Sequence, residues 1–145
     1  MKKLLAVFLI AVVFDVSHAQ ISIPKVDTKS VTSSVMKDFI KPPAIGDIGA
    51  TTSSIVNMLT SKLSLTDALK PKLTDAIGAF LKDKKLITGL ADTNPADYLA
   101  KFGPLQKGLF TKMKGIIGAD AFTKMMGLKP SGSSIAGNPL SNLFF

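Results

Sequence analysis

The sequence contains no cysteine, arginine, glutamate or tryptophan, and its one histidine lies in a segment that we expect to be cleaved off. Without cysteine, the chain forms neither a disulfide framework nor a thiolate metal site. Without a histidine, a catalytic serine lacks its commonest base, and without arginine, bidentate phosphate recognition is lost. An enzyme would have to use Asp, Lys, Ser, Thr and Tyr98. We therefore predict a non-enzymatic protein with no catalytic residue, metal or cofactor.

The N-terminus has the pattern of a secretory signal peptide. Two lysines precede an apolar run, Leu4–Phe14, and the small residues Ser17 and Ala19 follow. Small residues at this spacing are typical of a signal peptidase site, so we expect cleavage after Ala19. The apolar run is shorter than the roughly 20 residues that a membrane-spanning helix needs. The sequence thus predicts that residues 1–19 are removed and that the protein is exported, to the periplasm or the cell exterior.

The chain that remains after cleavage is basic, with 16 lysines and 9 aspartates and therefore a net charge of +7. A surplus of positive charge favours loose association with anionic surfaces, such as a membrane. Nucleic acid is not an expected partner, because the lysines are spread over the whole chain and the single tyrosine is isolated.

Apolar residues recur at helical spacing, and no segment alternates as a strand does. We predict an all-α fold, a small bundle of five to six short helices in residues 30–130. An extended arm at 20–29 precedes the bundle and a turn-rich, flexible tail at 131–145 follows it. The end of this tail is apolar and is able to dock on the domain or on a partner through Leu143, Phe144 and Phe145.

The first predicted helices are Ser30–Ile40, which two prolines end, and Ser53–Leu63. The next contains Leu-Thr-Asp-Ala twice, so either Thr66 or Thr74 can be its N-cap. We favour Thr66, which leaves Pro71 close to the first turn. The repeat is then a pair of capping signals on one amphipathic helix rather than a ligand site. Its apolar stripe continues every four residues, at Leu65, Leu69, Leu73, Ile77 and Leu81.

In the second half of the chain, Asn94 is the expected cap of a short helix that Gly103 ends, and Pro104 begins another. The near-repeats FTKMKGI (Phe110–Ile116) and FTKMMGL (Phe122–Leu128) each resemble the end of a helix with a glycine just beyond it. The acidic residues around Asn94 lack the glycine and the final glutamate of a calcium loop, so no calcium site is predicted.

The candidate partner-binding surface lies between Phe102 and Met126. Methionine and phenylalanine offer adaptable apolar contact area, and neighbouring lysines attract acidic chains. The alternative is that the apolar residues are core and the lysines a solvated face. The candidate residues are Phe102, Lys107, Phe110, Lys112, Met113, Lys114, Phe122, Lys124, Met125 and Met126.

The stretch LTDALKPKL (Leu65–Leu73) resembles the L-T-x-x-Q motif of the small periplasmic helical proteins of the Spy and CpxP family. IGADAFTKM (Ile117–Met125) resembles it more distantly. Leu69 and Ala121 stand where the family has its glutamines, and Gly118 replaces the second threonine. The resemblance implies a cradle-like dimer that holds unfolded clients on a basic, partly apolar surface. The signal peptide, which ends in Ala-Gln, resembles those of exported Bacteroidetes proteins.

Two functions follow as hypotheses. The first is an exported binding protein that holds an unfolded client or another envelope protein. The second is an amphipathic helical protein that binds lipid or an anionic membrane surface. The oligomeric state is left open. Because no side chain of the cleaved chain normally titrates between about pH 5 and 8, stability should be flat there unless a buried Asp or Lys is strongly shifted.

Overall fold

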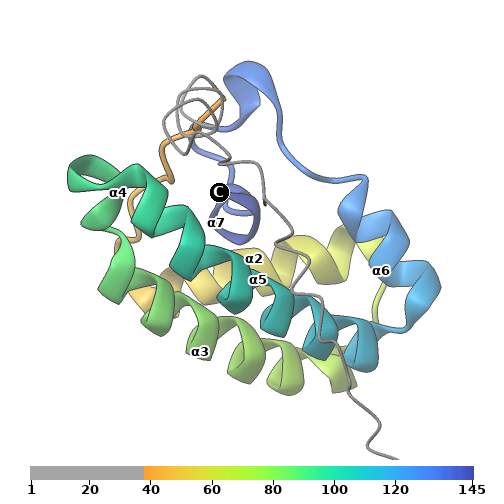
Figure 1. Ribbon diagram of the computed structural model, residues 1–145. Helices are drawn as coiled ribbons and strands as arrows, with labels where there is room; N and C mark the ends of the chain where they lie inside the picture. The colour runs from red at the N-terminus through yellow and green to blue at the C-terminus, as the bar shows by residue number, and fades with distance from the viewer. Residues whose placement is uncertain (1–37) are drawn as a thin grey trace, which may run out of the picture.

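The computed structural model of the protein describes residues 38–145 (Figure 1), and within them the chain is helical, with no strand. The prediction of a small all-α bundle is confirmed. The expected signal peptide, the arm and most of the helix at Ser30–Ile40 lie outside the described residues, and residues 38–40 are not helical. The six α-helices are α2 (Ile48–Leu63), α3 (Lys70–Ile87), α4 (Leu90–Thr93), α5 (Pro95–Ile117), α6 (Ala119–Met126) and α7 (Ser141–Phe144), with 3₁₀ turns η1 (Asp67–Leu69) and η2 (Gly132–Ser134).

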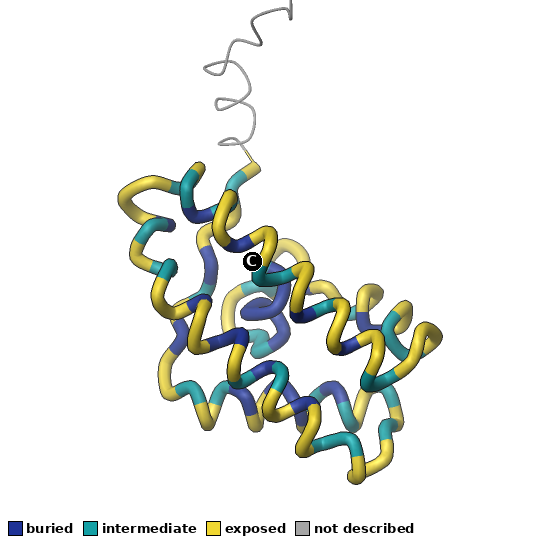
Figure 2. The backbone as a smooth tube through the Cα atoms, turned by 60° about the horizontal axis from the view of Figure 1, so that its bottom comes forward, coloured by how far each residue is buried: buried dark blue, intermediate teal, exposed yellow. Residues whose placement is uncertain are grey.

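The long helices α2, α3 and α5 form the body of the bundle. Helix α3 packs against both α2 and α5, and α6 folds back to contact α5 and α2. The short helix α7 lies among these elements, and the chain crosses from α6 over the bundle to reach it (Figure 1). Figure 2 shows that buried positions face inward along each long helix while exposed positions face outward. The core therefore comes from one face of each long helix together with the end of the chain.

Helix α2 begins at Ile48, five residues before the predicted start at Ser53. Asp47 is its N-cap, because an Asp47 carboxylate oxygen accepts a hydrogen bond of 2.7 Å from the backbone N–H of Ala50. The Thr52 hydroxyl donates to the carbonyl of Ile48 at 2.6 Å. Such a bond lets a threonine stay inside a helix without leaving its hydroxyl unpaired. The threonines and serines at positions 51–54 thus lie in the first turns of the helix.

Thr66 precedes η1 rather than an α-helix, and its side chain makes no capping bond. The α-helical part starts at Lys70, which places Pro71 in the first turn, where a missing N–H costs nothing. The prediction that Thr66 caps the long helix is therefore wrong in its detail, although one helix does follow. Thr74 lies inside α3. Before this turn, Ser64 ends α2 with a left-handed backbone at φ 51°.

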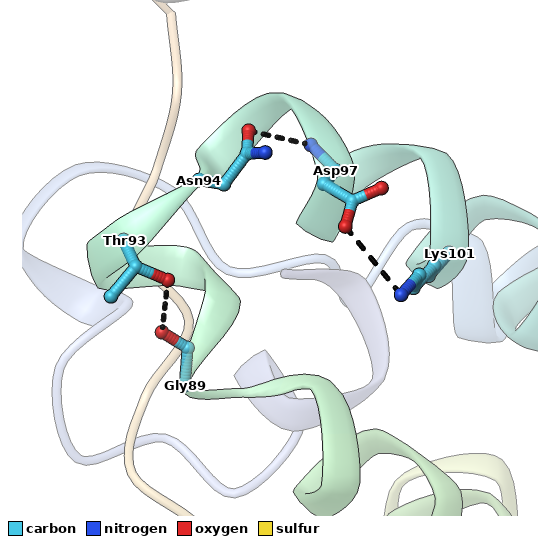
Figure 3. Close-up of polar contacts among 5 residues, drawn as sticks. All are labelled: Gly89, Thr93, Asn94, Asp97 and Lys101. Atoms are coloured by element: carbon cyan, nitrogen blue, oxygen red, sulfur yellow. Dashed lines mark hydrogen bonds and ion pairs between the residues drawn. The ribbon is translucent and has the colours of Figure 1, made fainter.

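The start of α5 agrees with the prediction (Figure 3). The Asn94 side chain accepts a hydrogen bond from the backbone N–H of Asp97 at 3.3 Å, and Pro95 is the first helical residue. Asp97 also pairs with Lys101 at 3.5 Å. Asp92 pairs with Lys41 at 2.5 Å. The polar residues that resemble a calcium loop in spacing alone thus cap a helix and form surface ion pairs.

The prediction that one helix ends at Gly103 and another begins at Pro104 is wrong. Helix α5 continues to Ile117 with Pro104 inside it. A proline inside a helix costs about 3 kcal/mol. Burial of one large apolar side chain contributes about 1.5–3 kcal/mol, and both Leu109 and Met113 beyond the proline are buried. Gly103 also has no Cβ to clash with the proline ring. Packing therefore outweighs the local stop signal.

The two near-repeats differ in outcome. FTKMKGI does not end a helix, since Gly115 lies within α5 and the helix ends at Gly118, where φ is +84°. FTKMMGL does end one, because α6 stops at Met126 and Gly127 follows it. The sequence signal is the same in both, but α5 continues three residues past Lys114, to Ile117, and packs against α6.

The prediction of a flexible tail over residues 131–145 does not hold for its last six residues. These residues, Leu140–Phe145, are named the C-terminal segment below. Leu140, Leu143 and Phe144 are buried in the hydrophobic core, with Leu143 0% exposed. The linker before them is largely exposed and is held by local bonds, such as the Ser131–Ser134 capping box. The apolar end of the chain docks on its own domain.

Candidate functional site

An aromatic cleft lies where α5, the C-terminal segment and residues 38–40 meet. Its volume is about 550 Å³. That volume is within the range of small-molecule sites, which are mostly apolar with a few polar groups. We name it the Tyr98 cleft. Its lining residues are Asp38, Phe39, Ile40, Tyr98, Leu99, Phe102, Lys129, Phe144 and Phe145.

The aromatic rings of the cleft are ordered by one turn of α5. Tyr98 and Phe102 are four residues apart and their rings stack, with centroids 5.4 Å apart. The ring of Phe39 meets Tyr98 edge-on at 6.1 Å. Such offset and edge-to-face pairs are the arrangements that aromatic rings prefer. Phe39 is half-buried and lies outside any helix, so it is the wall that moves with the smallest disturbance of the bundle.

Tyr98 brings an unsatisfied polar atom to this cleft. The residue is 1% exposed, and its hydroxyl has no hydrogen-bond partner among residues 38–145. Burial raises the pKa of Tyr98 above its usual range, so the hydroxyl keeps its proton and remains able to donate as well as accept. A buried polar group without a partner costs about 1–3 kcal/mol. The hydroxyl would therefore gain from a ligand oxygen that reached it through the cleft.

One cation and one anion lie at the edge of the cleft. The Lys129 ammonium lies 5.0 Å from the centre of the Phe145 ring, in a cation–π contact. Asp38, on the segment before α2, is exposed. Lys129 makes no ion pair among the described residues. An acidic head group in the cleft would therefore have a cation available to it.

A buried lysine holds the C-terminal segment from the other side. Lys84, on the core face of α3, is 0% exposed, and its ammonium donates a hydrogen bond of 2.8 Å to the carbonyl of Asn142. It also donates to the main-chain oxygen of Phe145. Gln106 of α5 donates to the carbonyl of Leu143 at 2.8 Å. The last carbonyls of a helix have no hydrogen-bond donor within the helix. Here the side chains of Lys84 and Gln106 donate to them.

Among residues 38–145, no aspartate pairs with Lys84. Its ammonium lies 5.3 Å from the centre of the Phe102 ring, and both of its hydrogen-bond acceptors are main-chain oxygens. Burial lowers the pKa of Lys84 to about 7. The cause of this shift is desolvation, which disfavours the charged form of a lysine. Lys84 is thus the strongly shifted buried lysine that would make stability depend on pH near neutrality.

The candidate residues between Phe102 and Met126 do not form one surface. Phe102, Met113 and Met125 are buried core residues. Met126 is 40% exposed on α6, away from the cleft. Phe102 is the only residue of the predicted set that lines the Tyr98 cleft. The exposed members of the set are Met126 and the four lysines Lys107, Lys112, Lys114 and Lys124.

Part of the set does meet, at a shallow groove between α5 and α6 of about 360 Å³. Phe110 and Phe122 pack edge-on there, with ring centroids 5.7 Å apart. Lys107 and Lys114 line the same groove. Lys112 instead lines a separate hollow beside Lys72 of α3. The combination of apolar rings and lysines that the sequence suggested is present on a smaller scale than predicted.

Sequence reasoning missed Tyr98, Lys84 and Lys129. Two of these left a signal. Tyr98 and Phe102 are four residues apart, which places both on one face of a helix. Lys84 continues the apolar stripe of Ile77 and Leu81 at helical spacing, which is unusual for a lysine. Lys129 gives no such signal, because the linker that contains it has no periodic pattern.

None of the helices in residues 38–145 combines the length and apolarity that crossing a membrane requires. No protein-family model matches this chain, and neither does any curated protein or solved structure.

Proposed function

We propose that this is an exported, non-enzymatic protein that binds a small amphiphile, an apolar molecule with one acidic head group, in the Tyr98 cleft. The observation that carries the proposal is the buried hydroxyl of Tyr98, which has no partner although it belongs to a residue that lines an aromatic cleft. A ligand oxygen would accept a hydrogen bond from this hydroxyl once Phe39 shifts aside. The apolar body of the ligand would then lie against the rings of Phe102 and Phe144.

The charge at the edge favours an acidic ligand over a basic one. Lys129 reaches over Phe145 with its ammonium and would pair with a carboxylate or phosphate at the mouth of the cleft. Asp38 is also at the mouth and opposes this preference, so the selectivity for an acid is expected to be modest. The apolar faces of the described helices pack on one another, which supports a folded binding protein over one that folds only on a membrane.

The test compares three probes with the same alkyl chain, dodecanoate, dodecanol and dodecylammonium, by titration calorimetry below their micelle concentrations. We expect dodecanoate to bind one per chain and more tightly than the other two. Tyr98→Phe removes the hydroxyl and keeps the ring, and should weaken dodecanoate by about fivefold. Lys129→Gln should reduce the preference for dodecanoate over dodecanol. Lys124→Gln, on an exposed lysine outside the cleft, is the matched control.

Failure of the folded wild-type protein to bind any of the three probes would overturn the proposal. So would binding that neither Tyr98→Phe nor Lys129→Gln alters. Binding of dodecylammonium in preference to dodecanoate would reject the acidic head group and assign Asp38 the recognition role.

A second candidate function is holding unfolded acidic clients at the groove between α5 and α6. It is favoured by one observation, that Phe110 and Phe122 are half-buried there beside Lys107 and Lys114. Salt screens the attraction between lysines and an acidic chain but leaves apolar contact intact. Higher salt should then slow association with an acidic client and still leave its aggregation suppressed. No suppression at equal concentrations would exclude this function.

A further inference from the structure

The C-terminal segment is bound to the bundle as a peptide ligand is bound in a groove. It is buried over Leu140–Phe144, whereas the linker that precedes it is mostly exposed. Figure 1 shows the chain leaving α6, crossing the bundle and entering it again at α7. Gly132 and Gly137 in this linker adopt positive φ values of 56° and 79°. The connection is thus a surface loop, and the contacts at its end hold the segment in place.

The bundle recognises main-chain oxygens and apolar side chains of the segment. Lys84 and Gln106 supply hydrogen bonds to carbonyls only. The ring of Phe144 lies 5.7 Å from that of Phe110. The hydroxyl of Ser141 bonds to the carbonyl of Ile135 in the linker rather than to the bundle. Among the described residues, no polar side-chain atom of the segment bonds to α2, α3 or α5. The groove therefore recognises the helical backbone and the apolar side chains of the segment.

This occupant is imperfectly matched to the groove. Among the described residues, the side-chain oxygen of Asn142 is buried without a partner. This feature lowers the affinity of the docked segment, because an unpaired buried polar atom is unfavourable. The Lys84 ammonium, by contrast, is bonded to main-chain oxygens of Asn142 and Phe145. A peptide with an apolar residue in place of Asn142 would avoid the penalty and keep the carbonyl contacts.

We propose that the groove holding the C-terminal segment is a binding site for an apolar, helix-forming peptide of a partner protein, which displaces that segment. The partner peptide carries apolar side chains at the spacing of Leu140, Leu143 and Phe144. Its last carbonyls accept hydrogen bonds from Lys84 and Gln106. Recognition of an amphipathic helix through regularly spaced apolar anchors is a recurrent mode of peptide binding. This site differs from the amphiphile site: Phe144 and Phe145 line the Tyr98 cleft, but in the groove they belong to the segment that is displaced.

The test uses the full chain with a protease site inserted in the exposed linker, between Gly132 and Ser133. After cleavage, the fragment that carries the C-terminal segment should remain bound through gel filtration. A fluorescein-labelled peptide with the sequence of residues 138–145, added in excess, should replace it and gain anisotropy. The same peptide with Asn142→Ala should bind more tightly, and one with Leu143→Ser and Phe144→Ser should not bind.

Variants of the bundle identify the contacts. Lys84→Met and Gln106→Leu should each weaken the labelled peptide by about fivefold, because each removes hydrogen bonds to its carbonyls. Lys82→Met, on the exposed face of α3, is the matched control and should leave binding unchanged. A folded, cleaved protein that neither releases its fragment nor accepts the labelled peptide would overturn the proposal. So would equal binding of the serine-substituted peptide.

Hydrogen exchange on the uncut chain provides the measurement if cleavage unfolds the protein. The amides of Leu143 and Phe145 bond to the carbonyls of Leu140 and Ser141. Excess Asn142→Ala peptide should accelerate their exchange, because the displaced segment loses its helical bonds, while amides in the centre of α3 stay protected. Unchanged exchange would overturn the proposal. A dimer of the uncut chain without added peptide would assign the groove to a second copy and overturn the assignment to a partner protein.

Discussion

The interface between α2 and α3 and the interface that holds the C-terminal segment bury different kinds of side chain. The first is formed by aliphatic residues such as Leu59 and Ile77, and its buried threonine, Thr52, bonds within its own helix. The second buries the Lys84 ammonium and an unpaired amide oxygen of Asn142. An aliphatic interface loses stability only when its volume changes. An interface with buried polar groups also responds to pH and to the identity of its occupant.

The largest expected effect is a loss of stability when one buried side chain is truncated, and this loss should differ between the two interfaces. Ile77→Ala in α3 should lower the free energy of unfolding by about 2–5 kcal/mol, as large-to-small changes in a core do. Leu143→Ala should lower it by less, although Leu143 is also 0% exposed. The loss there is limited to the free energy with which the segment docks, if it opens without the rest. Urea unfolding followed by circular dichroism measures both.

Equal losses for the two variants would mean that the C-terminal segment and the helical body unfold as one unit. A matched control is Ala79→Gly on the exposed face of α3, which should cost about 1 kcal/mol through helix propensity alone.

The next effect in size is a dependence of stability on pH that comes from Lys84. An unfolded lysine holds its proton up to about pH 10.4, whereas Lys84 in the folded protein releases it above a pKa of about 7. Between these values the unfolded state binds more protons. The free energy of unfolding should therefore rise by about 1.4 kcal/mol per pH unit from pH 7 to 10, and be lost again as the pH falls to 7.

Urea unfolding at several pH values measures this slope. Lys84→Met should abolish it, and Lys82→Met on the exposed face should retain it. Above about pH 10 the stability should fall, because the pKa of Tyr98 is raised in the folded state and the unfolded tyrosine loses its proton first. A flat profile from pH 7 to 10 would show that Lys84 is solvated, and would contradict the buried position of its ammonium.

A smaller effect is expected from the hydroxyl of Tyr98. Tyr98→Phe removes a buried polar atom that has no partner and keeps the stacked ring, so the ligand-free protein should gain about 1 kcal/mol. Thermal unfolding without and with dodecanoate measures the change. The gain should shrink when dodecanoate is present, because only the wild-type hydroxyl bonds to it. Destabilisation of the ligand-free variant would mean that the hydroxyl has a partner in solution.

The residues that the sequence predicted well are those whose roles depend on near neighbours. The stripe through Leu73 and Ile77 gave α3, and Asn94 with Pro95 gave the start of α5. Pro104 misled because local stop signals carry no information on what is buried beyond them. Lys84 was missed for the same reason, since its partners lie 58 and 61 positions away in the chain. The candidate site depends on such distant contacts, so only its ring pair at positions 98 and 102 and the place of Lys84 on the apolar face of α3 were open to prediction.

The last effect compares two residues that precede long helices, of which only Thr66 was predicted to be a cap. The Asp47 carboxylate accepts the N–H of Ala50, whereas the Thr66 hydroxyl caps nothing. Asp47→Ala should therefore cost about 0.5–2 kcal/mol, the usual value of an N-cap. Thr66→Ala should change stability by less than about 0.5 kcal/mol, as surface substitutions usually do. Both residues are exposed and precede long helices of the same aliphatic interface, so each is the control of the other. If Thr66→Ala proved the more costly, α3 would begin at η1 in solution, and Pro71 would lie inside the helix rather than in its first turn.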